Sequence, residues 1–321
     1  MSAPLLSVVI PSYDSAALLA AGLTALDAQV QEGTDRAFEI IVVDDGSADG
    51  TVERVEALRL RAPLRLIRQR RRGRAAARNA GAAAAAAPVL LFLDADVRPE
   101  PGLIEAHLRH YRGGTRVGVQ GRTLQHPATL TTIFMRATNL LPDLTVRRRE
   151  DLSPLHVITR NFSVLAAAFR EVGGFDEAFA GYGWEDIELG LRLRQAGVRL
   201  RYEPAALAYH HHRQSLEDLQ PKLRQAGAGA VYFWNKWGRP AWLGLFLEIH
   251  PVLLPLKWLV YRTGPVTKAA EALRPFAERR QILPLCSEIY NHLLWRAYYE
   301  GVFAARRPAR GEARSAAGAG A

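Results

Sequence analysis

The chain has 321 residues, 49% of them hydrophobic and 23% charged, which is enough for one large α/β domain with an extension or for two small domains. Its single cysteine, Cys286, excludes internal disulfide bonds and cysteine metal clusters, and it fits a reducing, cytoplasmic location. The formal net charge of +10 suggests an anionic partner, such as a nucleotide, a phospholipid surface or a nucleic acid. The chain turns polar at residues 11–14, which is too early for a secretory signal.

Apolar runs and helical patterns alternate through the first third of the chain. We expect strands at residues 5–10, 38–43, 64–67 and 89–93. Between them we expect a helix capped by Ser15, a helix from Thr51 to about Arg61, and an alanine-rich helix at residues 75–87. Strands that alternate with helices of this length are typical of βαβ units, so the sequence predicts an α/β fold with a mostly parallel sheet flanked by helices.

The strand at residues 89–93 runs directly into Asp94-Ala95-Asp96. Because side chains alternate along an extended chain, Asp94 and Asp96 are expected on the same side. Two carboxylates after a buried strand are costly without a counter-charge, which a divalent cation bound to a phosphate would supply. An isolated Asp-x-Asp is more often an ordinary surface turn, so this motif needs support from the rest of the chain.

Polar and basic segments follow each of the expected strands. In open α/β sheets, ligands bind beyond the carboxyl ends of the strands. We therefore expect these segments to meet at one edge of the sheet: residues 11–14, 44–47, 70–74 and 94–96.

The middle of the chain has a looser pattern. We expect a helix near residues 102–111 and strands at 117–120, 161–169 and 198–202, whereas residues 121–160 have no clear period and could cover a substrate. Residues 185–197 alternate like a strand, but acids at the start, arginines near the end and Gly197 as a stop favour a helix.

Helical patterns dominate from Ser215 onward. The sequence predicts a first domain at residues 1–213, a mainly α-helical carboxyl-terminal extension at 214–303, and a disordered tail at 304–321. Residues 241–261 are the most hydrophobic, but charged residues and two prolines interrupt them. Core packing or contact with a membrane surface is therefore favoured over a transmembrane span.

Six motifs in order resemble family 2 of the glycosyltransferases, an inverting group with the GT-A fold. They are SVVIPSY at residues 7–13, VVDDGS at 42–47, RNAG at 78–81, FLDAD at 92–96, GGFD at 173–176 and GWED at 183–186. The resemblance covers about residues 5–212 and leaves the carboxyl-terminal third without a motif. It implies transfer of a sugar from a nucleotide-diphosphate donor, with a UDP-sugar favoured, to a hydroxyl acceptor.

The resemblance also implies residues that bind the donor. Asp45 would accept a hydrogen bond from the base, and Arg74 and Arg78 would reach the ribose or the diphosphate, since a guanidinium makes paired bonds to phosphate. The alternatives are an ordinary Asp-Gly turn for Asp45 and a solvated helix face for Arg74 and Arg78, and for arginines 70–72 the solvated face is favoured. The full nucleotide-sugar-binding set comprises Pro11, Tyr13, Asp14, Asp44, Asp45, Ser47, Arg74, Arg78 and Asp94. At position 14 the family more often has asparagine.

A divalent cation, Mn²⁺ or Mg²⁺, is the implied cofactor. Asp96 with Asp94 would contact it, and His211 resembles the histidine that completes the metal shell in many relatives. His210 or His212 could replace His211. The cation would neutralise charge on the departing nucleoside diphosphate.

The Glu185-Asp186 pair carries the implied catalytic role. Asp186 would be the general base that accepts the proton of the acceptor hydroxyl, and Glu185 would orient the acceptor. Trp184 could stack on an acceptor sugar or belong to the core. The alternative for both acids is that they simply begin a helix and favour its dipole.

These observations favour a metal-dependent enzyme of cell-envelope synthesis that acts on a glycan or lipid-linked acceptor. We expect it in the cytoplasm, with peripheral contact to the inner membrane face. Nucleotidyl transfer would need a glycine-rich phosphate loop after the first strand, which residues 11–14 are not. A non-catalytic protein that binds nucleotide-sugars or polyanions is the remaining alternative. No nucleic acid is expected, because aromatic residues do not interleave with the basic runs.

Overall fold

The computed structural model of the protein describes residues 3–29, 38–138, 150–179, 181–262 and 264–306. The chain divides into two compact units. The first contains Met1–Ala180 and Glu185–Arg213, and the second contains Gly181–Trp184 and Gln214–Ala321. The last helix ends at Ala305, and the rest of the expected disordered tail, from residue 307, lies outside the described residues.

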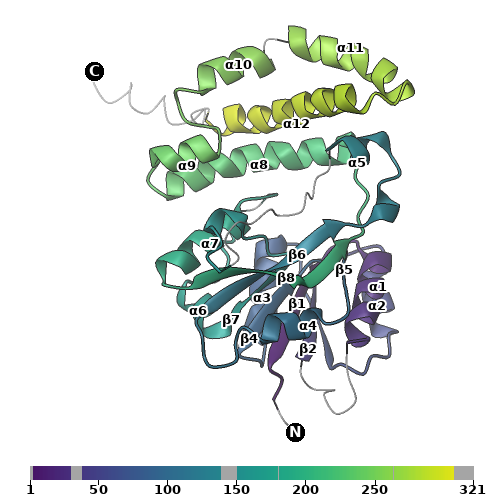
Figure 1. Ribbon diagram of the computed structural model, residues 1–321, viewed down its shortest axis with the longest axis vertical. Helices are drawn as coiled ribbons and strands as arrows, with labels where there is room; N and C mark the ends of the chain where they lie inside the picture. Colours follow the sequence, from purple (N-terminus) through teal and green to yellow (C-terminus); the bar gives the residue numbers. More distant parts are fainter. Residues whose placement is uncertain (1–2, 30–37, 139–149, 180, 263, 307–321) are drawn as a thin grey trace, which may run out of the picture. The chain divides into compact units, whose positions relative to one another are not determined.

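An eight-stranded sheet with the order β3-β2-β1-β4-β7-β6-β8-β5 forms the centre of the first unit (Figure 1). In the described residues, all strands run in one direction except β7 and β5, which run in the opposite one. The predicted α/β fold with a mostly parallel sheet is therefore confirmed. The strands are β1 (Leu6–Ser12), β2 (Phe38–Asp44), β3 (Leu64–Arg68), β4 (Val89–Leu93), β5 (Val97–Pro99), β6 (Val117–Gln125), β7 (Asn161–Leu165) and β8 (Arg199–His210).

Helices cover both faces of this sheet. The buried side chains of α1, α2 and α4 pack on one face, and those of α3, α6 and α7 pack on the other. Alternate residues of the strands supply the two cores: Leu91 and Leu93 join the first, whereas Leu90 and Phe92 join the second. The helices are α1 (Ala16–Asp27), α2 (Thr51–Glu56), α3 (Arg74–Ala84), α4 (Leu103–Leu108), α5 (Ile133–Thr138), α6 (Ala166–Glu171) and α7 (Glu185–Gln195).

Several boundaries differ from the expected ones. The strand expected at residues 161–169 stops at Leu165, and α6 begins in the alanine run that follows, because alanine favours helix. The strand expected at 198–202 continues to His210 because β8 pairs with both β6 and β5. The helix expected to reach Arg61 ends at Glu56.

Ser15 lies at the N-cap position of α1, but its side chain does not cap the helix. The Ser15 hydroxyl donates to the carbonyl of Tyr13 instead. The carboxylate of Asp49, from the loop before α2, accepts the first helical N–H, that of Ala16, at 3.0 Å. A carboxylate suits this position because the helix dipole favours negative charge there.

The helix α3 lies close to the sheet because small residues face it. A Cβ atom at Gly81 would lie 2.4 Å from Cγ1 of Val9, and Ala77 is buried on the same side. Any larger residue at position 81 would push α3 outward. Arg78 lies one turn before Gly81, so this close packing brings its guanidinium within reach of the strand ends.

A buried polar chain crosses the core between α4 and β7. The Tyr111 hydroxyl lies 2.8 Å from the Ser163 hydroxyl, which lies 2.8 Å from Nδ1 of His107, and Nε2 of His107 lies 2.9 Å from Oδ1 of Asn161. The Asn161 amide nitrogen donates to two carbonyl groups, so Oδ1 accepts and Nε2 of His107 carries a proton. Burial lowers the pKa of His107 to about 4, so the ring is neutral near pH 7. A Cβ at Gly121 would overlap the Asn161 side chain, so glycine is required there.

The second unit is helical, which confirms the predicted carboxyl-terminal region. In Figure 1, α12 lies between α8 and the pair α10 and α11. None of the described helices combines the length and apolar character needed to cross a membrane. The helices are α8 (Leu216–Lys236), α9 (Ala241–Phe246), α10 (Leu254–Arg262), α11 (Pro265–Arg279) and α12 (Leu283–Ala305).

Two glycines allow α8 and α12 to touch through their backbones. A Cβ at Gly227 would lie 1.9 Å from the carbonyl oxygen of Tyr298, and a Cβ at Gly301 would lie 1.9 Å from that of Arg224. Real Cβ atoms do not approach oxygen so closely, so both positions require glycine for this packing.

Candidate active site

The strand pairing brings most of the predicted motifs to one edge of the sheet. Ser12 at the end of β1 pairs with Asp44 at the end of β2, and β4 lies on the other side of β1. β7 runs antiparallel to β4, so Asn161 pairs with Leu93 and the residues before Asn161 reach the same edge. β8 ends there at His210.

The loops after β1 and β2 are tied to each other. The backbone N–H of Asp14 donates to the Ser47 hydroxyl at 2.9 Å, and the N–H of Ala48 donates to Oδ1 of Asp14 at 2.8 Å. Asp14 has a φ of 46°, in the left-handed region that aspartate and asparagine tolerate better than most residues. Aspartate can therefore stand where the family more often has asparagine, because both supply the same acceptor oxygen and backbone geometry.

Asp45 is buried and organises the basic loop that follows β3. Its carboxylate accepts hydrogen bonds from the Gln69 side chain at 2.7 Å and from the backbone N–H groups of Arg72 and Gly73, both at 2.8 Å. Asp44 accepts from the turn that it begins. The contact between Asp45 and the base of the nucleotide stays a prediction, because the Asp45 carboxylate already accepts three hydrogen bonds within the protein.

Tyr13 and Arg71 form an exposed stacked pair at this edge. The Arg71 guanidinium carbon lies 4.0 Å from the centre of the Tyr13 ring, and Nη1 donates to the phenol oxygen at 3.0 Å. Arg72 pairs with Glu177 at 2.8 Å. Sequence reasoning favours a solvated face for residues 70–72, whereas two of these arginines make specific contacts.

Arg78 joins the two acidic motifs. Its side chain is 2% exposed, and its Nη atoms lie 2.8 Å from Oδ1 of Asp94, 3.2 Å from Oε1 of Glu185 and 3.5 Å from Oδ1 of Asp186. Burial alone would lower the pKa of this guanidinium, but the three carboxylates outweigh burial and raise it. The predicted contact of Arg78 with the ribose or diphosphate stays a prediction, since both Nη atoms already face carboxylates.

Glu185 is 1% exposed, so contact with an acceptor would require it to rearrange. Burial and the neighbouring Asp186 charge raise the pKa of Glu185. Oε1 faces Arg78 and, at 3.7 Å, Arg74, and Oε2 is buried without a hydrogen bond to any described residue. The structure therefore gives Glu185 the position of an anchor for two arginines.

Asp186 lies in the first turn of α7 and is 20% exposed. The backbone N–H of Thr159 donates to Oδ2 at 3.1 Å, and the Thr159 hydroxyl donates to Oδ1. Thr159 itself is fully buried. A carboxylate that is held in place and still reaches the surface can accept a proton from a ligand.

Trp184 belongs to the second unit. Its indole N–H donates to the carbonyl of Ala226 at 2.7 Å, and its ring packs edge-on against Phe246 and Tyr298. These contacts are those of a core side chain. A role for Trp184 in acceptor binding stays a prediction.

His210 is the histidine beside Asp96. Its Nε2 lies 3.2 Å from Oδ2 of Asp96, and its ring is buried. His211, the expected ligand, points elsewhere and stacks on His126 with the ring centres 4.2 Å apart. Burial, followed by Arg98 and His126, lowers the pKa of His211 to about 4. The two histidines differ in place because His210 is the last residue of β8 and pairs with Val97, whereas His211 follows the strand and its backbone N–H donates to the carbonyl of Asp96 at 2.8 Å.

Gln125 fixes how His210 carries its proton. The Gln125 amide nitrogen donates to the carbonyl of His212 at 3.1 Å, so its Oε1 accepts from Nδ1 of His210 at 3.0 Å. Nε2 of a neutral His210 then presents a lone pair to Asp96, and only a proton or a metal cation placed there removes the repulsion. Burial opposes ionisation of Asp96, but a His210 that carries a proton on Nε2, together with the charges of His212 and Arg160, outweighs burial and lowers the pKa of Asp96 to about 2.

Asp96 and His210 fit a divalent cation. Oδ1 of Asp96 is buried and makes no hydrogen bond to a described residue, which leaves it available as a ligand. No group of three or more histidine, cysteine or acidic side chains that could hold a metal occurs among the described residues. A cation here would thus depend on substrate phosphate and water for its other ligands, as Mg²⁺ commonly does.

Thr159 and Gln125 could not be predicted from the sequence, because both lie in residues 121–160, which have no periodic pattern. Asn79, between Arg78 and Gly81, has a further role: its side chain exchanges two hydrogen bonds of 2.9 Å with the backbone of Phe175, which ties the RNAG and GGFD motifs together.

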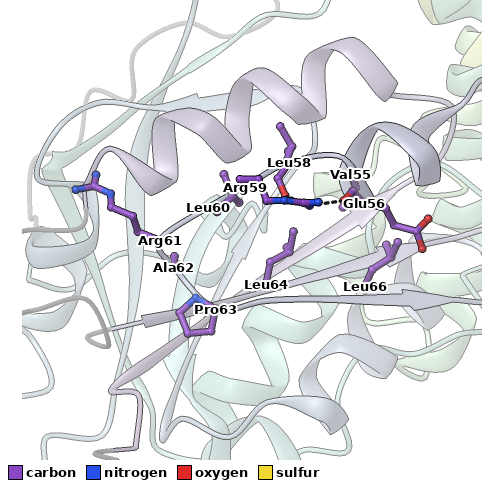
Figure 2. Close-up of a pocket in the computed structure, with 10 residues that line it drawn as sticks. All are labelled: Val55, Glu56, Leu58, Arg59, Leu60, Arg61, Ala62, Pro63, Leu64 and Leu66. Atoms are coloured by element: carbon purple, nitrogen blue, oxygen red, sulfur yellow. Dashed lines mark hydrogen bonds between the residues drawn. The ribbon is translucent and has the colours of Figure 1, made fainter.

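The pocket in Figure 2 is separate from this edge, since residues 55–66 at the end of α2 and in β3 line it.

The fold and the acidic pairs at its edge define the class, an α/β protein of the GT-A type. The profile described as "Glycosyl transferase family 2" matches residues 7–173, and one described as "N-terminal domain of galactosyltransferase" matches residues 157–214. The chain belongs to glycosyl transferase family 2.

Curated relatives agree with this family. The chain is 37% identical to "Validoxylamine A glucosyltransferase" of Streptomyces hygroscopicus subsp. jinggangensis over 295 residues, which is 81% of this chain and 65% of that protein. It is 34% identical to "Pre-mycofactocin glycosyltransferase" of Mycobacterium tuberculosis, covering 66% of this chain and 44% of that protein. The chain thus spans less than two thirds of the length of either relative.

Solved structures share the fold. The mannosyltransferase PcManGT from Pyrobaculum calidifontis, in complex with GDP-Man and Mn²⁺, matches 94% of this chain and 88% of its own with a TM-score of 0.58 and 18% identity. S. aureus TarS 1–349, in complex with UDP-GlcNAc, matches 94% of this chain and 89% of its own with a TM-score of 0.57 and 17% identity.

Proposed function

We propose that the protein is an inverting glycosyltransferase that moves a sugar from a nucleoside diphosphate donor to an acceptor hydroxyl with the help of Mn²⁺ or Mg²⁺. One observation carries this proposal: buried Arg78 links Asp94, in the expected donor and metal motif, to Asp186, the expected base. Two acidic groups with separate roles are thus held at a fixed distance from each other.

Asp186 is the proposed general base. As the acceptor oxygen forms its bond to the anomeric carbon, the bond between that carbon and the diphosphate oxygen breaks, and the acceptor proton passes to the Asp186 carboxylate. One displacement of this kind inverts the anomeric centre and needs no enzyme nucleophile. Thr159 supports the step because its two hydrogen bonds hold both carboxylate oxygens in place.

Asp96 and His210 are the proposed protein ligands of the cation, with His210 preferred over His211 because of its place beside Asp96. Gln125 orients His210 from behind, as second-sphere groups commonly do for metal-binding histidines. When bound, the cation would neutralise charge on the leaving diphosphate.

The donor base and the acceptor are further parts of the proposal. The solved neighbours hold GDP-Man in one case and UDP-GlcNAc in the other. We retain a UDP-sugar as the favoured donor and a glycan or lipid-linked acceptor, in cytoplasmic synthesis of surface polysaccharide or glycolipid. The relative named validoxylamine A glucosyltransferase makes validoxylamine A or a similar compound the second candidate acceptor.

Donor binding and hydrolysis with UDP-, GDP- and dTDP-sugars, with and without Mn²⁺ or Mg²⁺, test the proposal. We expect one donor to bind only with metal, Asp96→Ala to lose that binding, and Asp186→Asn to bind the donor but not turn it over. Arg116→Gln, which breaks an exposed ion pair with Glu171 just before the start of β6, serves as the control. Binding of a donor without any turnover, in every condition and with either acceptor class, would favour the non-catalytic alternative.

A further inference from the structure

Exposed apolar side chains concentrate on one part of the second unit. Sixteen large hydrophobic side chains are exposed in the described part of the chain, and twelve of them lie between residues 242 and 283. Soluble proteins scatter such side chains singly, and a concentration of this kind marks an interaction surface.

The outer sides of α10 and α11 carry the centre of this concentration. Both helices pack one side on α12, where Leu254, Ala270 and Ala277 are buried. The side chains that form what we call the α10–α11 surface are exposed by 46% to 62%: Leu256, Trp258, Leu259, Val266, Leu273 and Phe276. In Figure 1 the two helices form the layer of this unit on the far side of α12 from α8.

The segment that carries these apolar side chains is also rich in basic residues. Between residues 252 and 283 the sequence has six basic residues and two acidic ones. Glu271 pairs with Arg296, and Glu278 pairs with Arg274 and accepts from Tyr290. Lys257 pairs with Glu248. The four remaining basic residues of this stretch form no ion pair with a described acidic residue: Arg262, Lys268, Arg279 and Arg280.

We propose that the α10–α11 surface binds an anionic phospholipid membrane, with both helices lying in the plane of the headgroups. An apolar face edged by lysine and arginine is what such a boundary recognises, since the apolar side chains enter the acyl region and the cations meet the headgroups. A second copy of the chain would bring two positively charged surfaces together, so charge complementarity favours lipid. The helices have 9 and 15 residues, and Pro275 lies inside α11, so they lie on a membrane and do not cross it.

Vesicle flotation tests this directly. The full chain is mixed with vesicles of phosphatidylcholine alone or with about 30% phosphatidylglycerol, at low salt and at about 0.5 M salt. We expect binding only to the anionic vesicles, and weaker binding in high salt. Leu256→Asp with Phe276→Asp is expected to lower the partition coefficient by about tenfold or more, because both side chains leave the apolar layer. Arg279→Gln with Arg280→Gln is expected to lower it by a similar factor.

Leu5→Asp is the matched control, because Leu5 is an equally exposed leucine of the first unit, and it is expected to bind vesicles as the unchanged chain does. Absence of vesicle binding, or equal binding by all variants, overturns the proposal. So does a concentration-dependent dimer in sedimentation that the Leu256 and Phe276 variant abolishes, which would assign the surface to a second copy. Flotation involves no sugar transfer, so its result is independent of the proposed reaction.

Discussion

Arg78 and Asp94 form an ion pair at 2.8 Å beneath the carboxyl edge of the sheet, and the Arg78 side chain is almost completely buried. A buried guanidinium is stable only when carboxylates surround it, and Asp94, Glu185 and Asp186 fulfil this condition. The first acidic motif and the last are thus parts of one charged cluster.

Replacing Arg78 by glutamine should destabilise the first unit by about 3 kcal/mol or more, because three carboxylates lose their common partner in a buried place. Urea denaturation measures the loss. The matched control is Arg72→Gln, which removes an ion pair whose members are 60% and 39% exposed and should cost less than about 1 kcal/mol. Equal losses for the two variants would show that Arg78 is not a structural hub.

Replacing Thr159 by valine removes one of the two hydrogen bonds that hold Asp186 and leaves the backbone bond. We expect kcat to fall about 10-fold to 100-fold while donor affinity stays within about twofold, because a base that turns away from the acceptor affects only the transition state. Thr159→Ser keeps the hydroxyl and should restore most of kcat. If serine rescues nothing, the hydroxyl does not position Asp186.

His210→Gln should weaken Mn²⁺ binding in the presence of UDP by at least about tenfold, as expected for loss of a metal ligand. His211→Gln should stay within about twofold of the unchanged protein, because its ring faces His126. Calorimetric titration with Mn²⁺ compares the two variants. The opposite order would return the role to His211.

The neutral His107 should make stability depend on pH. Burial lowers the pKa of His107 to about 4, whereas an unfolded histidine titrates near its usual value of 6.5. Between these values the unfolded chain binds more protons, so stability is fully present above about pH 6.5 and falls as the pH drops toward 4. At pH 5 the expected loss is about 2 kcal/mol relative to pH 7. Urea denaturation at the two pH values measures this loss. His107→Gln should lose less unfolding free energy between pH 7 and pH 5 than the unchanged chain, and equal losses would contradict this account.

The sheet edge could be predicted because its signals are local. Apolar runs that end in acidic or polar residues predict buried strands and their ligand-binding ends without knowledge of the rest of the chain. The burial of Arg78 could not be predicted, because one of its partners lies 107 positions away in the sequence. A sequence gives the charge of such a group but not its distance from a counter-charge.

The three consecutive histidines show a different limit. Alternation along an extended chain predicts that His210 and His212 face one side and His211 the other, but not which side faces Asp96. That choice depends on the register between β8 and β5, in which Val97 pairs with His210. A slip of one residue would reverse it, and no local pattern fixes the register of such a short pairing.

The close approach of α8 and α12 at Gly227 and Gly301 also has a use beyond this molecule. Residues 214–303 carry no family motif by which they could be found in another chain, yet the two longest helices, α8 and α12, can meet in this way only where neither carries a side chain at the contact. One glycine in each of two long helical stretches is therefore a sequence marker for the unit. Chains that carry both glycines after a family 2 domain are expected to share this helix pair, and chains with a larger residue at either place are expected to hold their helices further apart.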